Sequence, residues 1–199
     1  MPIEPIILRT LGTAQVDIGR IQVRPNAVRR FSVLLYLSAE PGRRVSRRCL
    51  IDLLFPEQTE KNGLHSLREL LYQLKSAGVA LDADQEGIEL PVGAVRADYA
   101  EMLDSERLTL EQIRAAQGGF LPGYAPHDSE AYTEWFEPFR ARTAFALSQV
   151  LLRAQERAQD VGNLEVSEAA ARACLAISPL NERAVRGLAE TMALGGAKM

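Results

Sequence analysis

The sequence predicts a mainly helical chain whose N-terminal part is of the α+β class. Short apolar segments typical of strands are confined to the N-terminal half, whereas apolar residues recur at helical spacing through almost all of the remainder. The chain has 199 residues, 47% hydrophobic and 25% charged, so it can bury a core without disulfides. We therefore predict two domains, at residues 1–95 and 96–199.

The N-terminal domain is expected to contain a small antiparallel sheet, three helices and a β-hairpin, in that order. Pro41-Gly42 ends the first helix, and Ser46 and Thr59 are the N-caps expected for the second and third. The predicted strands are residues 6–11, 14–18, 21–23, 79–81 and 88–90. The predicted helices are residues 26–40, 47–54 and 59–78.

The C-terminal domain is expected to be helical from Asp98 onward. A periodic stretch at 130–160 predicts one long helix with a kink near Pro138, because proline removes a backbone hydrogen bond. Two shorter helices are expected at 164–177 and from Asn181 to about residue 194. Small-residue helices of similar length with this punctuation are typical of TPR-like antiparallel α-helical hairpins.

Charge is distributed unevenly along the chain, although the formal net charge is only −3. Residues 20–55 contain eight arginines against Glu40 and Asp52, a local net charge of +6, whereas residues 96–199 carry 11 basic and 15 acidic residues. The basic segment favours an anionic partner. The alternative is that these arginines are solvated or pair with the acidic second half.

The element order and several motifs resemble one family of bacterial regulators. Residues 29–37 (RRFSVLLYL) and 41–56 (PGRRVSRRCLIDLLFP) are similar to the DNA-binding half of the antibiotic-regulatory-protein (SARP-type) activators. Residues 119–123 (GFLPG), 134–136 (EWF) and 178–182 (SPLNE) resemble the bacterial transcriptional activator domain that follows it. The resemblance covers nearly the whole chain.

The resemblance implies a promoter-binding transcriptional activator. Residues 1–95 would form an OmpR-like winged helix-turn-helix that places its third helix in the major groove and its hairpin, the wing, against the neighbouring backbone. The TPR-like domain at 96–199 would contact RNA polymerase, a sigma factor or a second copy of the chain in a homodimer. Double-stranded promoter DNA is thus the implied ligand.

The third helix can carry base-reading side chains on one face. At about 100° per residue, Leu64, Leu67, Leu70, Leu71 and Leu74 fall on the inner face. The expected base readers on the opposite face are Asn62, His65, Glu69 and Tyr72. Asparagine can pair with adenine and glutamate can accept from cytosine. The alternative is an ordinary polar, solvated helix face.

Basic residues near this helix are expected to contact phosphate. The expected phosphate contacts are Arg43, Arg44, Arg47, Arg48, Lys61, Arg68 and Lys75. Three features depart from the family pattern: the wing carries Asp82, Asp84 and Glu86 without a basic residue, Glu69 adds negative charge, and Gly63 lies in the first turn, where glycine is unfavourable. Glu69 and the acidic wing favour the alternative of a protein-interaction module whose winged helix no longer binds DNA.

Other chemistries have little support in the sequence. With only His65 and His127 and two distant cysteines, Cys49 and Cys174, we expect buried, reduced thiols and no metal site. The run His127-Asp128-Ser129 is contiguous and so a poor catalytic triad, and no phosphate-binding or dinucleotide motif is present. We expect no enzyme, no cofactor, no membrane segment and a cytoplasmic location.

The last helix is expected to leave an apolar face uncovered. Helical hairpins in such arrays are stabilised by stacking on their neighbours, and the related activator domains continue for further hairpins. We therefore expect the array to be incomplete at its C-terminal end, or to be covered by self-association.

Overall fold

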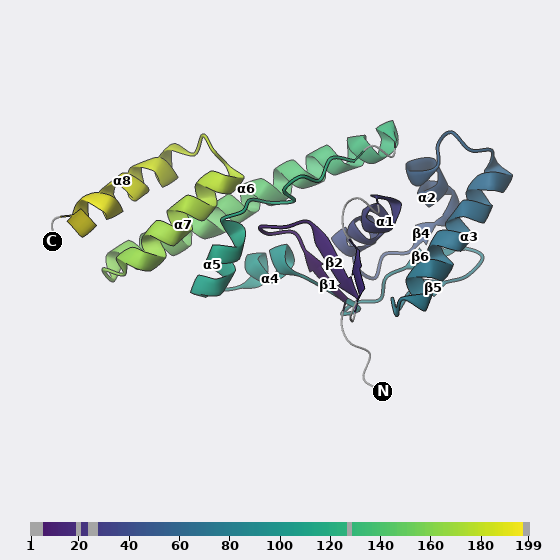
Figure 1. The fold of residues 1–199 in the computed structure, drawn as a ribbon, viewed down its shortest axis with the longest axis horizontal. Coiled ribbons are helices and arrows are strands. Elements are labelled where there is room, and N and C mark those ends of the chain that lie inside the picture. Colours follow the sequence, from purple (N-terminus) through teal and green to yellow (C-terminus); the bar gives the residue numbers. More distant parts are fainter. Residues whose placement is uncertain (1–5, 19–20, 24–27, 127–128, 197–199) are drawn as a thin grey trace. The chain divides into compact units, whose positions relative to one another are not determined.

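The structure, a computed structural model, describes residues 6–18, 21–23, 28–126 and 129–196 (Figure 1). It is mostly helical, with a small N-terminal sheet region and a helical C-terminal part, which confirms the predicted fold class. The chain divides into two compact units. The first unit comprises Met1–Arg9, Ala14–Ala97 and Gly123–Pro138, and the second comprises Thr10–Thr13, Asp98–Pro122 and Phe139–Met199.

One sheet of the first unit contains the predicted N-terminal strands and one strand that the sequence did not predict. Its order is β3-β2-β1-β7, with β1 antiparallel to β2 and β2 antiparallel to β3. The antiparallel pairing predicted for the three N-terminal strands is confirmed, and β7, which was not predicted, adds to β1 in parallel. The strands are β1 (Ile6–Arg9), β2 (Gln15–Ile18), β3 (Ile21–Val23) and β7 (Val95–Ala97).

A second sheet, of order β4-β6-β5, holds the predicted hairpin. The strands are β4 (Val45–Ser46), β5 (Asp82–Ala83) and β6 (Gly87–Glu89). β5 begins three residues later than predicted, because Val79 and Leu81 are buried ahead of the strand rather than within it. β4 was not predicted, since two residues are too few to show an alternating pattern.

The three helices of the first unit lie where the sequence predicted them (Figure 1). They are α1 (Val28–Ala39), α2 (Arg47–Leu54) and α3 (Glu60–Ser76). The Ser46 hydroxyl accepts the backbone N–H of Cys49, and the Thr59 hydroxyl accepts that of Asn62, so both predicted N-caps are confirmed.

The core of the first unit includes side chains from the start of α6 (Glu130–Asp160). Tyr132 and Phe136 are fully buried. The Tyr132 hydroxyl donates to the Ser32 carbonyl (3.1 Å) and accepts from the Tyr124 hydroxyl (3.0 Å), which is 2.9 Å from the Ser32 hydroxyl. Buried hydroxyls must be satisfied in this way, so the segment at 123–138 is integral to the first unit although it follows the predicted boundary at 95/96.

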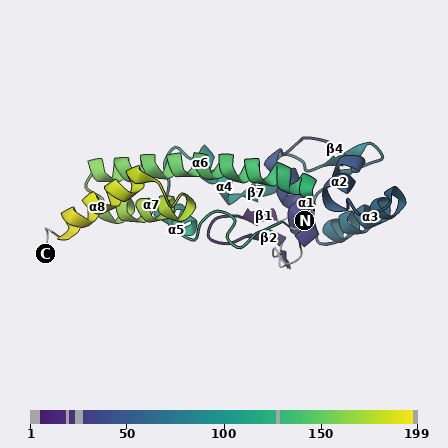
Figure 2. The same ribbon diagram turned by 90° about the horizontal axis from the view of Figure 1, so that it is seen from above.

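The second unit is helical and is built around the remainder of α6, from Phe139 onward. Its other helices are α4 (Asp98–Asp104), α5 (Leu110–Ala116), α7 (Leu164–Ile177) and α8 (Glu182–Gly196). α7 and α8 run in opposite directions and pack against each other (Figures 1 and 2). Gln159 of α6 donates to the Gly187 carbonyl of α8, and Ser167 of α7 hydrogen-bonds Thr191 of α8, so polar contacts join all three helices.

The short segment Thr10–Thr13 belongs to the second unit and is held there by Asp98. The Asp98 carboxylate accepts the backbone N–H of Thr10 (2.8 Å) and of Leu11 (3.1 Å), and the Thr10 hydroxyl (2.6 Å). Burial raises the pKa of Asp98, whereas these hydrogen bonds act in the opposite direction.

The two cysteines differ in burial. Cys174 is buried in α7, as predicted, and burial raises the pKa of its thiol to about 11. Cys49 is only half-buried, so the prediction of a buried thiol is wrong for this residue; its sulfur lies 3.7 Å from the Tyr36 hydroxyl. Both thiols are free.

Apolar side chains are exposed along α8, as the sequence led us to expect. Val185, Met192 and Leu194 are each more than half exposed. They share α8 with Ala184, Gly187 and Thr191, which are buried. The helix thus buries small residues inward and presents larger apolar ones to solvent.

Candidate nucleic-acid interface

The α3 helix separates an apolar inner face from a polar outer face. Its buried residues are Gly63, Leu67, Leu70, Leu71 and Leu74, with Leu64 half-buried. All four expected base readers, Asn62, His65, Glu69 and Tyr72, are exposed, and Tyr72 is 72% exposed. The helical-wheel prediction of which side chains lie inside and outside is therefore confirmed, apart from the partial exposure of Leu64.

A groove at the start of α3 brings together four of the expected contact residues. It has a volume of about 640 Å³. Its expected contact residues are Lys61, Asn62, His65 and Arg68. Ser66 donates to Gln58 across 2.8 Å, which ties the preceding loop to the helix. Gln58 and Ser66 were not singled out in the sequence, because their pairing depends on the loop conformation.

The other expected residues of α3 lie outside this groove, further along the helix. Glu69 accepts a hydrogen bond from the Gln73 side chain (3.2 Å), and Lys75 lies in the last turn. Tyr72, like Glu69 and Lys75, is exposed to solvent. A ligand that reached all four predicted readers would have to lie along more than two turns of the helix.

Gly63 has a structural reason for its place in the first turn of α3. A Cβ atom at this position would lie 2.6 Å from Cγ2 of Ile51 in α2. The glycine therefore allows α2 and α3 to approach closely, which compensates its unfavourable helix propensity.

The arginines before and within α2 contact acidic residues of the same unit. Arg44 forms ion pairs with Asp82 (3.4 Å) and Glu89 (3.6 Å) of the hairpin, and also with Asp84. Arg47 donates from Nε to the Asp84 carbonyl at 2.7 Å. The acidic hairpin thus binds the basic cluster, whereas the sequence led us to expect the cluster to be solvated, phosphate-bound or paired with the acidic second half.

Asp84 is the central carboxylate of this contact. Its Oδ1 accepts the backbone N–H groups of Glu86 (2.8 Å) and Gly87 (3.0 Å), which close the hairpin turn. These hydrogen bonds, with the charge of Arg44, lower the pKa of Asp84. Asp84 therefore stays ionised and keeps the hairpin next to Arg44.

The remaining two arginines of the cluster are more exposed. Arg43 pairs with Glu40, three residues earlier, and Arg48 lies 3.9 Å from Asp52, one turn later. The Arg48 side chain is 87% exposed. Ion pairs of this kind contribute little to stability, so a phosphate can replace the carboxylate at small cost.

The residues that the structure describes give little support for a metal site or a membrane segment. Among the described residues, no group of three or more His, Cys, Asp or Glu side chains could hold a metal ion. His127 and Asp128 lie outside the described residues. None of the helices described has an apolar stretch long enough to cross a membrane.

The chain resembles a known protein in its structure, whereas no match to its sequence is found. No protein-family profile matches the sequence, and no curated protein matches it. The structure is similar to that of Mycobacterium tuberculosis EmbR, solved in complex with a low-affinity phosphopeptide, with a TM-score of 0.61 and 18% sequence identity. The match covers 96% of this chain and 55% of the EmbR chain, so the chain spans about half the length of EmbR. The two proteins thus share a fold over nearly the whole of this chain.

Proposed function

We propose that the chain is a DNA-binding transcriptional regulator that acts as an activator. The observation that carries the proposal is the exposed polar face of α3, which begins in a groove lined by Lys61, Asn62, His65 and Arg68. The similarity of fold to EmbR, a regulator of the SARP type, supports it, as does the sequence resemblance to that family.

In this proposal the first unit is a winged helix-turn-helix and α3 is its recognition helix. Asn62 would pair with adenine and Glu69 would accept from the amino group of cytosine, with His65 and Tyr72 on the same face. Lys61, Arg68 and Lys75 would contact phosphates on either side of the groove. Arg43 and Arg48, whose ion pairs are exposed, would add phosphate contacts at the start of α2.

The helical unit would act as a TPR-like activator domain. The exposed apolar side chains of α8 are suited to a protein contact, with RNA polymerase, a sigma factor or a second copy of the chain as the partners to test. Nothing in this role requires a catalytic residue or a cofactor.

The test is selection of duplex DNA from a random pool by the purified chain at two salt concentrations. We expect a sequence motif to be enriched, and affinity to fall steeply as salt rises, because each phosphate contact releases counterions. For the variant Arg47→Glu/Arg48→Glu we expect at least about a tenfold loss of affinity and a smaller salt slope.

Two further variants keep this test interpretable. Arg47 contacts the hairpin, so Arg48→Glu/Arg68→Glu repeats the charge change without removing that contact. Arg142→Glu/Arg186→Glu introduces the same charges on exposed arginines of the helical unit and is expected to leave affinity nearly unchanged. Equal losses in all three variants would mean that net charge, and not the α2–α3 surface, determines binding.

A second candidate function is a protein-binding module in which the winged helix no longer binds DNA. The specific observation in its favour is that Arg44 is already paired with the hairpin carboxylates Asp82, Asp84 and Glu89. No retention of any duplex at low salt would favour this function over the first.

The acidic hairpin leads to a prediction that separates the two functions. If the first unit binds DNA, Asp82→Asn/Asp84→Asn should raise affinity about three- to tenfold at low salt, because it removes two negative charges and frees Arg44 for phosphate. Competition binding with a fluorescent duplex measures the change. Glu86→Gln, on the same hairpin but without an ion pair to Arg44, removes one negative charge and is the control for the effect of one hairpin charge alone. Unchanged affinity in the double variant would contradict the prediction.

A further inference from the structure

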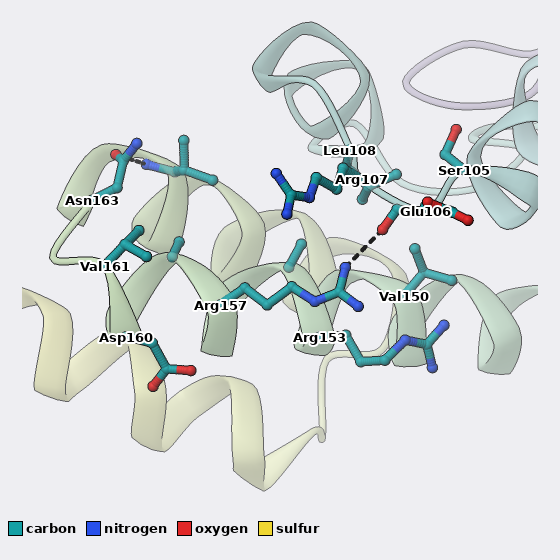
Figure 3. Close-up of a pocket in the computed structure, with 13 residues that line it drawn as sticks. Ser105, Glu106, Arg107, Leu108, Val150, Arg153, Arg157, Asp160, Val161 and Asn163 are labelled. Atoms are coloured by element: carbon teal, nitrogen blue, oxygen red, sulfur yellow. Dashed lines mark hydrogen bonds between the residues drawn. The ribbon is translucent and has the colours of Figure 1, made fainter.

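A cavity in the helical unit lies outside the proposed nucleic-acid interface. It has a volume of about 860 Å³, within the range of about 300–1,000 Å³ that is usual for small-molecule sites. Its floor is the face of α6 that carries Val150, Ala154 and Ala158, and the loop Ser105–Leu108 forms one wall (Figure 3). Asn163 and Val166, at the start of α7, also line it.

Three arginines line this cavity. Arg153 and Arg157 lie one turn apart on α6, and Arg107 comes from the facing loop. Figure 3 shows Arg157 extending from α6 towards that loop, where it donates to the Glu106 carbonyl at 2.7 Å. Like charges one turn apart on a helix are unfavourable, so this arrangement costs stability unless an anion is bound.

The acidic residues at the cavity do not neutralise these arginines. In the part of the chain that the structure describes, Glu106 and Asp160 form no ion pair, and Arg107 and Arg153 form neither an ion pair nor a side-chain hydrogen bond. Asp160 points away from the loop (Figure 3). The guanidinium groups of Arg107 and Arg153 are therefore open to a ligand.

The loop that carries Arg107 is held in place without a ligand. The Ser105 hydroxyl donates to the Glu101 carbonyl (2.6 Å), and Thr109 and Gln112 form a capping box at the start of α5. An anchored loop keeps the cavity preformed, which reduces the entropy lost on binding.

Apolar groups complete the lining. Leu108 and Val166 are both part of the lining, and Val161, directly after α6, is 78% exposed. A ligand with an apolar body would cover these side chains while its charged end met the arginines.

We propose that this cavity binds a small organic anion: an apolar body that carries a carboxylate or a phosphate, with the anionic oxygens held by Arg107, Arg153 and Arg157. Arginine suits both anions because its planar donors match either one bidentately. The site is distinct from the α3 surface and its test does not depend on DNA binding.

The test uses the full 199-residue chain and three probes that share a naphthalene ring: 2-naphthoate, 1-naphthyl phosphate and the uncharged 2-naphthamide. Methyl NMR spectra follow Val150, Leu108 and Val166. We expect saturable shifts at these methyl groups with at least one anion, an apparent Kd of about 1 mM or tighter, and binding of the amide at least about tenfold weaker. Whichever anion binds more tightly identifies the preferred charged group.

Variants test the role of the arginines. Arg153→Gln/Arg157→Gln is expected to weaken anion binding at least about tenfold, and Arg142→Gln/Arg186→Gln, outside the cavity, by less than about twofold. Arg157 also donates a hydrogen bond to the loop, so its replacement can move the loop. The single variants Arg107→Gln and Arg153→Gln each remove one positive charge and leave that hydrogen bond in place. The proposal is overturned if neither anion binds, if the amide binds equally well, if both double variants lose equal affinity, or if the shifts are confined to the exposed side chains of α8.

Discussion

Replacing Tyr132 by alanine is expected to lower the free energy of unfolding of the first unit by about 3–5 kcal/mol, the usual cost of deleting a large buried aromatic side chain. Tyr132 is fully buried, its ring centre lies 5.2 Å from that of Trp135, and its hydroxyl joins Ser32 to Tyr124. The variant therefore loses packing and leaves buried polar groups without partners.

Fluorescence of Trp135 measures this effect directly. It is the single tryptophan of the chain, and it belongs to the first unit, where it packs edge-on against Tyr36 at 4.7 Å. Urea titration of Tyr132→Ala should show an earlier transition. Tyr132→Phe, which keeps the ring, should cost about 1–3 kcal/mol, and the exposed Glu134→Ala should change little. A loss below about 1 kcal/mol for the alanine variant would contradict the role given to this residue.

Gly118→Ala is expected to destabilise the second unit by about 2–3 kcal/mol, since overpacking against backbone cannot be relieved by a side-chain rotation. A Cβ atom at Gly118 would lie 2.5 Å from Cα of Gly12. In the opposite direction, a Cβ atom at Gly12 would lie 2.5 Å from the Ala115 carbonyl oxygen, and Gly12 has φ +71°. Two backbone segments thus cross where only glycine fits.

Thermal unfolding followed by far-ultraviolet circular dichroism would test this prediction. Hydrogen bonds from Gly12 to the Gly119 carbonyl (2.8 Å) and from Leu121 to the Thr10 carbonyl (2.7 Å) hold the crossing together, so its displacement should lower the midpoint clearly. Gly196→Ala is the control, because no atom lies within 4 Å of its Cβ position and alanine favours a helix. An equal midpoint for Gly118→Ala and the natural chain would show that the two backbone segments can move apart at little energetic cost.

Local signals in the sequence were sufficient for the three helices of the first unit and for the caps of α2 and α3, but not for the loop between α4 and α5. Ser46 and Thr59 identified the starts of α2 and α3, and the leucine spacing identified the inner face of α3. The sequence shows that Gly63 is an unfavourable residue in the first turn of a helix. Its structural role depends on Ile51, which belongs to another helix. Propensity describes one helix at a time, so it cannot show where two helices approach.

Non-local pairings could not be predicted in the same way. The parallel pairing of β7 with β1 joins residues almost ninety positions apart, and nothing in Val95–Ala97 identifies its partner. The pairing of Arg44 with the hairpin is also non-local, so it was not predicted, although the acidic residues of the hairpin were identified from the sequence. The sequence shows that Arg153 and Arg157 are spaced by one helical turn. It does not show that the loop Ser105–Leu108 forms a cavity with them.

The interleaving of the two units has a consequence for synthesis of the chain. The strand β7 ends at Ala97, yet Tyr132 and Phe136, which complete the core of the first unit, are translated much later. At about 5–20 residues per second, the ribosome needs about 2–8 s to make the intervening segment. During this interval the nascent first unit exposes the apolar surface that α6 later covers, so it is a natural client for chaperones that act during translation.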